Sequence, residues 1–161
     1  MELDTRNIVL HSLKATCLWK LNDLPGATEE LKTVIDIEPS HAGAIVDLME
    51  LYLLLNKIDD FDDLYKRNKT IVESRGGERG VKYYFDILRE YQLKKYDDVR
   101  RLVERYIEPL PFGKEKRIQW DFSDVRTYLK SNPSDTGRNL LELFIKLASG
   151  DISTEEAKVQ I

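Results

Sequence analysis

The sequence contains few of the residues from which disulfides and metal sites are built. Cys17 is its only cysteine, so a single chain can form neither a disulfide nor a thiolate zinc site. A reducing, intracellular location fits this composition best. His11 and His41 are the only histidines, and neither has a Cys, His or Glu at the helical spacing of a recognisable metal site. We predict that the protein uses no metal and no other cofactor.

Long apolar runs and a strong excess of positive charge are also missing. No stretch reaches the length of a membrane-spanning helix, and residues 1–5 lack the features of a signal peptide. A soluble, most simply cytoplasmic protein with no membrane insertion is therefore predicted. The formal net charge of -4 argues against a broad nucleic-acid surface, which needs clustered Lys and Arg. We interpret the one basic concentration, around Arg100, Arg105 and 114–117, as a solvated helix face and linker.

Catalytic motifs are absent as well. The chain has no Gly-x-Ser-x-Gly turn, no nucleophile beside a base and no spaced carboxylate pair. The aspartates of 59–63 do not form a calcium loop, because Leu64 and Tyr65 stand where oxygen ligands are needed. Carboxylates at a helix start are the simpler interpretation, since they favour the helix dipole. The sequence predicts that the protein is not an enzyme.

What the sequence does contain is a succession of amphipathic helices. At 161 residues it has the length of about one domain. Apolar residues recur every three or four positions, which predicts helices over 5–21, 25–37, 41–56, 61–73, 79–93, 96–107, 122–131 and 135–148. A short helix follows Ser153, and 112–119 is the best candidate linker. No segment alternates like a half-buried strand, so the predicted fold class is all-α.

The first predicted helix has one apolar stripe, which we expect to be its packing face. The stripe consists of Leu10, Leu13, Cys17, Leu18 and Leu21. Polar side chains, including His11 and Lys14, occupy other positions of the same helix.

Three pairs of helices share one pattern. Aligning their second helices sets 24–27 over 61–64 and 96–99, so that Ala27, Leu64 and Val99 correspond. The steps between them are 37 and 35 residues, close to the period of about 34 in tetratricopeptide repeats. Ala15, Ala27 and the terminating Pro39 also match that repeat. The chain thus resembles the tetratricopeptide superfamily over about 5–111.

This resemblance implies an architecture and a function. Antiparallel helix pairs would stack as a short right-handed superhelix over 1–111, and 112–161 would form a linker and helical cap of the same compact unit. Such proteins bind a peptide or a partner protein in a concave groove, so the resemblance implies a non-catalytic interaction module or scaffold. The groove positions here are Trp19, Lys20, Glu50, Leu53, Leu54, Phe85, Arg89 and Gln92. An apolar strip of Trp19, Leu53, Leu54 and Phe85, with Lys20 and Arg89 beside it, would suit an amphipathic segment carrying acidic residues.

Two alternatives remain open from the sequence. The groove side chains could instead pack against the C-terminal helices or against a neighbouring copy of the chain. The protein could also be a regulatory or sensor domain of a larger protein, holding a small ligand or that protein's own catalytic domain. A closed pocket beside Tyr84 and Tyr91 would favour this second function. A helical-repeat RNA binder is disfavoured by the acidic charge balance.

Overall fold

A computed structural model of the chain describes residues 7–75, 80–108, 117–132 and 137–161. These residues form α-helices and connecting turns without any strand, which confirms the all-α fold class. Within them, no helix has the length and apolar character needed to cross a membrane. Contacts group the chain into a first unit, Met1–Val72, and a second unit, Glu73–Ile161. The position at 111, where we expected the repeat region to end, lies inside the second unit.

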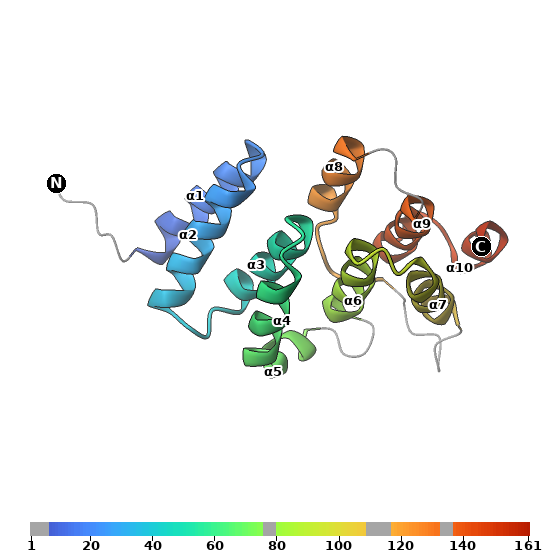
Figure 1. Ribbon diagram of the computed structural model, residues 1–161, viewed down its shortest axis with the longest axis horizontal. Helices are drawn as coiled ribbons and strands as arrows, with labels where there is room; N and C mark the ends of the chain where they lie inside the picture. The colour runs from blue at the N-terminus through green and yellow to red at the C-terminus, as the bar shows by residue number, and fades with distance from the viewer. Residues whose placement is uncertain (1–6, 76–79, 109–116, 133–136) are drawn as a thin grey trace. The chain divides into compact units, whose positions relative to one another are not determined.

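The first unit is a chain of helices that pack in sequence order. Its helices are α1 (Ile8–Lys20), α2 (Leu24–Ile37), α3 (Ala42–Leu54), α4 (Ile58–Arg67) and α5 (Lys69–Glu73), the last of which runs to the unit boundary. α1 packs along α2, α2 against α3, and α3 against α4 (Figure 1). Side-chain caps from Asn7, Asp23 and His41 fix the starts of the first three helices. The predicted start of α1 at Thr5 lies outside the described residues.

The packing face of α1 is not the predicted stripe. Ala15 is the buried residue of this helix, whereas Leu10, Leu13 and Leu21 are 43%, 57% and 78% exposed. On the side of α1 that faces α2, both His11 and Lys14 contact Glu30 of α2. A small residue and these polar contacts therefore orient the helix, and most of the predicted stripe points outward, whereas Leu18 is half-buried.

The same turn joins the two helices of a pair in three places. Asn22, Asn56 and Lys94 adopt positive φ angles of 61°, 57° and 60°. In each turn this residue donates its N–H to the carbonyl three residues earlier, and the next residue donates to the carbonyl five residues before itself. Such a left-handed residue is a common way to end a helix. The three hairpins are therefore closed by one backbone geometry.

The spacing of these turns corrects the sequence alignment. From position 22 to 56 is 34 residues, and from 56 to 94 is 38. α4 begins at Ile58 instead of at 61, so the equivalent of 24–27 is 58–61, with Phe61 in the place of Ala27. The four-residue gap predicted between the helices 41–56 and 61–73 was wrong, because Asn56 ends α3 with the same turn that ends α1 at Asn22.

Replacing Lys94 with Gly should stabilise the second unit by about 0.5–1 kcal/mol, because a left-handed conformation is strained for a residue with a Cβ. Urea unfolding followed by Trp120 fluorescence in a Trp19→Phe background measures this change. Lys95→Gly is the matched control. The φ angle of Lys95 is -87°, which suits any residue, so Gly there relieves no strain and only adds conformational freedom to the unfolded chain. Equal effects of the two substitutions would contradict the role given to this turn.

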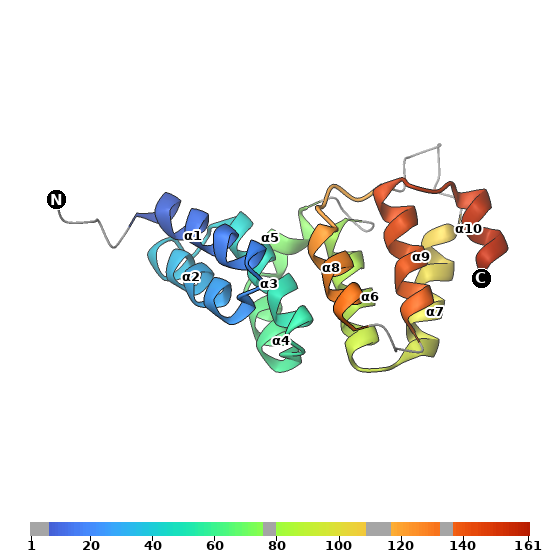
Figure 2. The same ribbon diagram turned by 90° about the horizontal axis from the view of Figure 1, so that it is seen from above.

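The second unit is built around a hairpin and two further helices. Its helices are α6 (Val81–Gln92), α7 (Tyr96–Ile107), α8 (Ser123–Ser131), α9 (Arg138–Ser149) and α10 (Thr154–Gln160). α6 packs against α7, α9 contacts both, and α10 lies beside α9 and α7 (Figure 2). Pro109 and Pro111, which follow the α6–α7 hairpin in the sequence, lie outside the described residues.

Part of the predicted linker belongs to this core. Residues 112–116 lie outside the described residues, but Ile118 donates its N–H to the Ala148 carbonyl at 2.9 Å and its side chain is buried. Phe122, just before α8, is also buried, and its ring meets that of Tyr84 edge to face at 5.0 Å. Tyr106 meets Phe144 of α9 in the same way at 5.1 Å. Aromatic side chains from both sides of the predicted linker thus form one core.

Candidate interaction surfaces

The predicted groove residues are divided between the two units. Trp19 and Lys20 lie at the end of α1, a second group lies on α3, and the third lies on α6. On α3, Glu50, Leu53 and Leu54 are all buried, since this helix is buried around most of its circumference. The open apolar strip that we expected from Leu53 and Leu54 is therefore not present. A role for these positions in partner binding stays a prediction.

Phe85 is a core residue. It is fully buried on α6, and its ring meets that of Trp120 edge to face at 5.6 Å. This is the packing against the C-terminal region that the sequence left open as an alternative. Two other predicted residues of α6 also have partners within this unit: Arg89 pairs with Glu90 at 2.8 Å, and Gln92 accepts a hydrogen bond from the Tyr128 hydroxyl at 3.2 Å. Sequence reasoning missed the contacts of Phe85 with Trp120 and of Gln92 with Tyr128 because these partners come from distant segments.

Among the described residues of the first unit, the exposed large apolar side chains lie on α1 and directly after it. We call this surface the outer α1 face, and it consists of Val9, Leu10, Leu13, Cys17 and Leu21. Val9, Leu13, Cys17 and Leu21 recur every four residues, so they form one line along the helix. Val9 is 66% exposed and the Cys17 thiol is also exposed. Trp19 is half-buried on another side of the helix, and Lys20 is exposed.

A polar cluster behind the outer α1 face fixes the orientation of the helix. Glu30 of α2 contacts His11 Nδ1 at 2.6 Å and Lys14 Nζ at 2.7 Å. The hydrogen bonds from Lys14 and His11 hold the pKa of the Glu30 carboxyl below its ordinary value, although partial burial opposes them. The carboxylate is thus stabilised in its charged form by α1, and α1 is held in one rotation about its axis.

The lowered pKa of Glu30 predicts a pH-dependent contribution to stability. Because the folded protein holds this carboxyl in its charged form, the contribution is present above the unfolded pKa, near 4.5, and is lost as the pH falls through the lower folded value. We expect Glu30→Gln to destabilise the first unit by about 1 kcal/mol at pH 5.5, with a smaller difference from wild type at pH 3. Urea unfolding followed by Trp19 fluorescence measures it. Glu29→Gln, at an exposed carboxylate paired with Lys32, should show almost no difference at either pH.

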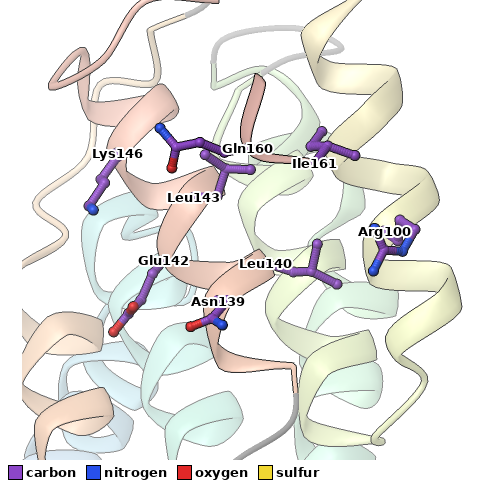
Figure 3. A pocket seen from close by; sticks show the side chains of 8 residues that line it. All are labelled: Arg100, Asn139, Leu140, Glu142, Leu143, Lys146, Gln160 and Ile161. Carbon is purple, nitrogen blue, oxygen red and sulfur yellow. The ribbon is translucent and has the colours of Figure 1, made fainter. Parts of the chain in front are cut away.

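The second unit carries an open cleft of about 550 Å³ between α7, α9 and α10 (Figure 3). Its apolar part is formed by Leu140, Leu143 and Ile161. Arg100 of α7 and Lys146 of α9 line it with exposed positive charges. Glu142 also lines the cleft and accepts a hydrogen bond from Arg138 Nε at 2.7 Å. Tyr84 and Tyr91, beside which a closed pocket would have favoured a sensor function, are buried in the core and do not line this cleft.

The acidic and histidine residues form no metal site within the described part of the chain. No group of three or more His, Cys, Asp or Glu side chains there is placed to hold an ion. His41 serves as a helix cap, since its Nδ1 accepts the Ala44 N–H at 3.0 Å. Asp59 and Asp60 lie in the first turn of α4, where negative charge suits the helix dipole.

Comparison with known proteins identifies no relative: no family model, no curated protein and no solved structure matches the chain.

Proposed function

We propose that the chain is a non-catalytic protein-interaction module of tetratricopeptide-like helix pairs, and that it docks another protein chain on the outer α1 face. The observation that carries this proposal is the exposure of three large apolar side chains on α1 and of Leu21 directly after it. Single apolar residues are common on protein surfaces, but a patch of them is typical of an interaction site. Lys20 lies at the same end of the helix as Leu21 and adds a positive charge at the edge of the patch.

The repeated hairpin turns support the tetratricopeptide-like part of the proposal. In arrays of helical repeats, each helix pair buries an apolar face against the next pair. α2 is covered in this way by α3, whereas Val9, Leu10, Leu13 and Leu21 of the outer α1 face are exposed. A helix of a bound protein would occupy the position that a neighbouring repeat takes within an array.

Affinity purification from the native cell, quantified by mass spectrometry, tests this function. We expect a double variant, Leu13→Gln with Leu21→Gln, to recover at least about tenfold less of the bound protein, because two apolar contacts are lost from the interface. The variant should fold normally, since both side chains are largely exposed. Val159→Gln is the matched control, because Val159 is 86% exposed on α10 and lies outside the patch. Unchanged recovery with the double variant would refute the proposed docking surface.

The cleft of the second unit favours a second candidate, a regulatory domain that holds a small ligand. An apolar base with two positive charges at its edge suits an aliphatic carboxylate. Decanoate is a suitable probe, and its binding should raise the melting temperature of wild type but not of an Arg100→Gln, Lys146→Gln double variant. Lys130→Gln, at an exposed lysine of α8, controls for the loss of charge. Equal shifts in all three proteins, or no shift in wild type, would rule out this ligand class.

A further inference from the structure

We propose that α10 is a mobile cover of the cleft, which opens in the free protein and which a bound aliphatic carboxylate holds closed against α7 and α9. This inference rests on the second candidate function, the regulatory domain, because it names the part of the fold that responds to the ligand. The attachment of α10 to its neighbours and its place in the cleft support it.

α10 is held on the second unit by little apolar contact. Of its seven residues, all of which the structure describes, Ala157 is buried, whereas Val159 and the following Ile161 are exposed. α9, by contrast, buries several large residues, among them Phe144 and Leu147. A helix as short as α10 is only marginally stable by itself, so its order depends on the surface it packs against. We therefore expect α10 to open at a much smaller free-energy cost than α9.

The segment before α10 is fastened, so the helix can open as one piece. Asp151 donates its N–H to the Lys146 carbonyl at 2.8 Å, and its carboxylate pairs with Arg126 of α8 at 2.6 Å. Ser153 begins α10 with a capping box, in which its hydroxyl accepts the Glu156 N–H and its own N–H is donated to the Glu156 carboxylate. The first set of contacts holds the connection to α9 and the second lies within α10 and its cap. An opening motion between them breaks neither.

α10 closes one end of the cleft. Gln160 and Ile161 line it, and Figure 3 shows both at one end, with Asn139 of α9 at the other. An alkyl chain that lies along Leu143 would cover the exposed part of Ile161. Such a ligand adds the apolar contact that α10 itself lacks, and it therefore stabilises the closed position.

Ligand binding and closure of α10 are thus coupled. A ligand that contacts α10 only in its closed position shifts the equilibrium toward that position, and closure raises the affinity for the ligand by the same factor. Arg100 and Lys146 belong to α7 and α9, so their positive charges stay at the cleft and attract a carboxylate when α10 is open. The order of α10 then reports whether the cleft is occupied.

Hydrogen exchange of the full chain, measured by mass spectrometry, tests the opening and its response to ligand. At short labelling times the amides of 157–160 should exchange at least about tenfold faster than those of α9, relative to their rates in an unfolded chain. Decanoate, at a concentration that gives its full melting-temperature shift, should slow the exchange of 157–160 at least about fivefold and leave α8 unchanged. Equal protection of α10 and α9 in the free protein would overturn the inference.

Ala157→Asp tests the coupling through the affinity for the ligand. A charge at this buried position should keep α10 open and weaken decanoate binding at least about fivefold in isothermal titration calorimetry. Val159→Asp is the matched control, because it adds the same charge at an exposed position of the same helix and should bind decanoate like wild type. Equal affinities of the two variants would contradict the role given to α10.

These experiments separate the inference from the candidate function. If decanoate raises the melting temperature of wild type but 157–160 exchange equally fast with and without it, the ligand site stands and the mobile cover is wrong. If decanoate does not bind wild type, both the ligand class and the cover that depends on it are wrong.

Discussion

Replacing Phe85 with Ala is expected to lower the free energy of unfolding of the second unit by about 3–5 kcal/mol. The side chain is fully buried, and its ring contacts those of Tyr84 and Trp120, each with centroids 5.6 Å apart. The helices around it cannot close the resulting cavity completely, so both burial and ring contacts are lost. Urea unfolding followed by tryptophan fluorescence in a Trp19→Phe background isolates the signal of Trp120, because the chain has two tryptophans.

Arg89→Ala is the control for this experiment. Sequence reasoning assigned both positions to a binding groove, but Arg89 is only half-buried and pairs with its neighbour Glu90. Its loss should change the free energy of unfolding by less than about 1 kcal/mol. If Phe85→Ala changed the free energy of unfolding as little as Arg89→Ala, Phe85 would not be a core residue, which would contradict the core that we describe.

Gly137→Ala should destabilise the second unit by about 2–3 kcal/mol. Gly137 is buried and precedes α9, and a Cβ at this position would overlap the ring of Tyr96 at the start of α7. The clash involves a ring rather than the end of a flexible side chain, so α7 and α9 would have to move apart. Tryptophan fluorescence in the Trp19→Phe background again gives the unfolding curve.

A second glycine provides the comparison. Gly43 lies in the first turn of α3, and a Cβ there would come no closer than 3.4 Å to another residue, the His41 ring. Gly43→Ala should therefore be neutral or stabilise the first unit by up to about 1 kcal/mol, because Ala favours the helix. Loss of stability in Gly43→Ala comparable to that in Gly137→Ala would show that steric overlap at Tyr96 is not the cause.

Much of the helical organisation could be predicted from the sequence. The periodicity over 96–107 matches α7 residue for residue, because charged and apolar positions separate cleanly on that helix. The start of α4 at Ile58 was predicted three residues too late, at Phe61, because the turn at Asn56 was not recognised. Asn tolerates the left-handed conformation better than most residues, so the shared Leu-Asn of 21–22 and 55–56 was the available signal.

The candidate surfaces were harder to predict for a physical reason. An apolar stripe shows that a helix face avoids water, but it does not show which chain covers that face. We therefore predicted Leu10, Leu13 and Leu21 as packing residues, although all three are exposed. We predicted Phe85 as a groove residue because one residue that covers it, Trp120, lies in an irregular segment without helical periodicity. Burial of this kind depends on contacts between distant parts of the chain, and a local pattern does not contain them.

Alkylation of Cys17 by N-ethylmaleimide measures most directly whether the outer α1 face is a docking surface. Cys17 is exposed in the middle of this face and is the only cysteine, so its labelling rate reports on this one site. A Val159→Cys, Cys17→Ser variant, with its thiol outside the face, corrects for reagent entry and cellular thiols. If the face is covered, Cys17 will react at least about tenfold more slowly in intact cells than in dilute purified protein, relative to that control. If the labelling rate of Cys17 relative to the control thiol were the same in cells and in dilute purified protein, the face would be open in the cell. That result would contradict the proposal that the outer α1 face is a docking surface.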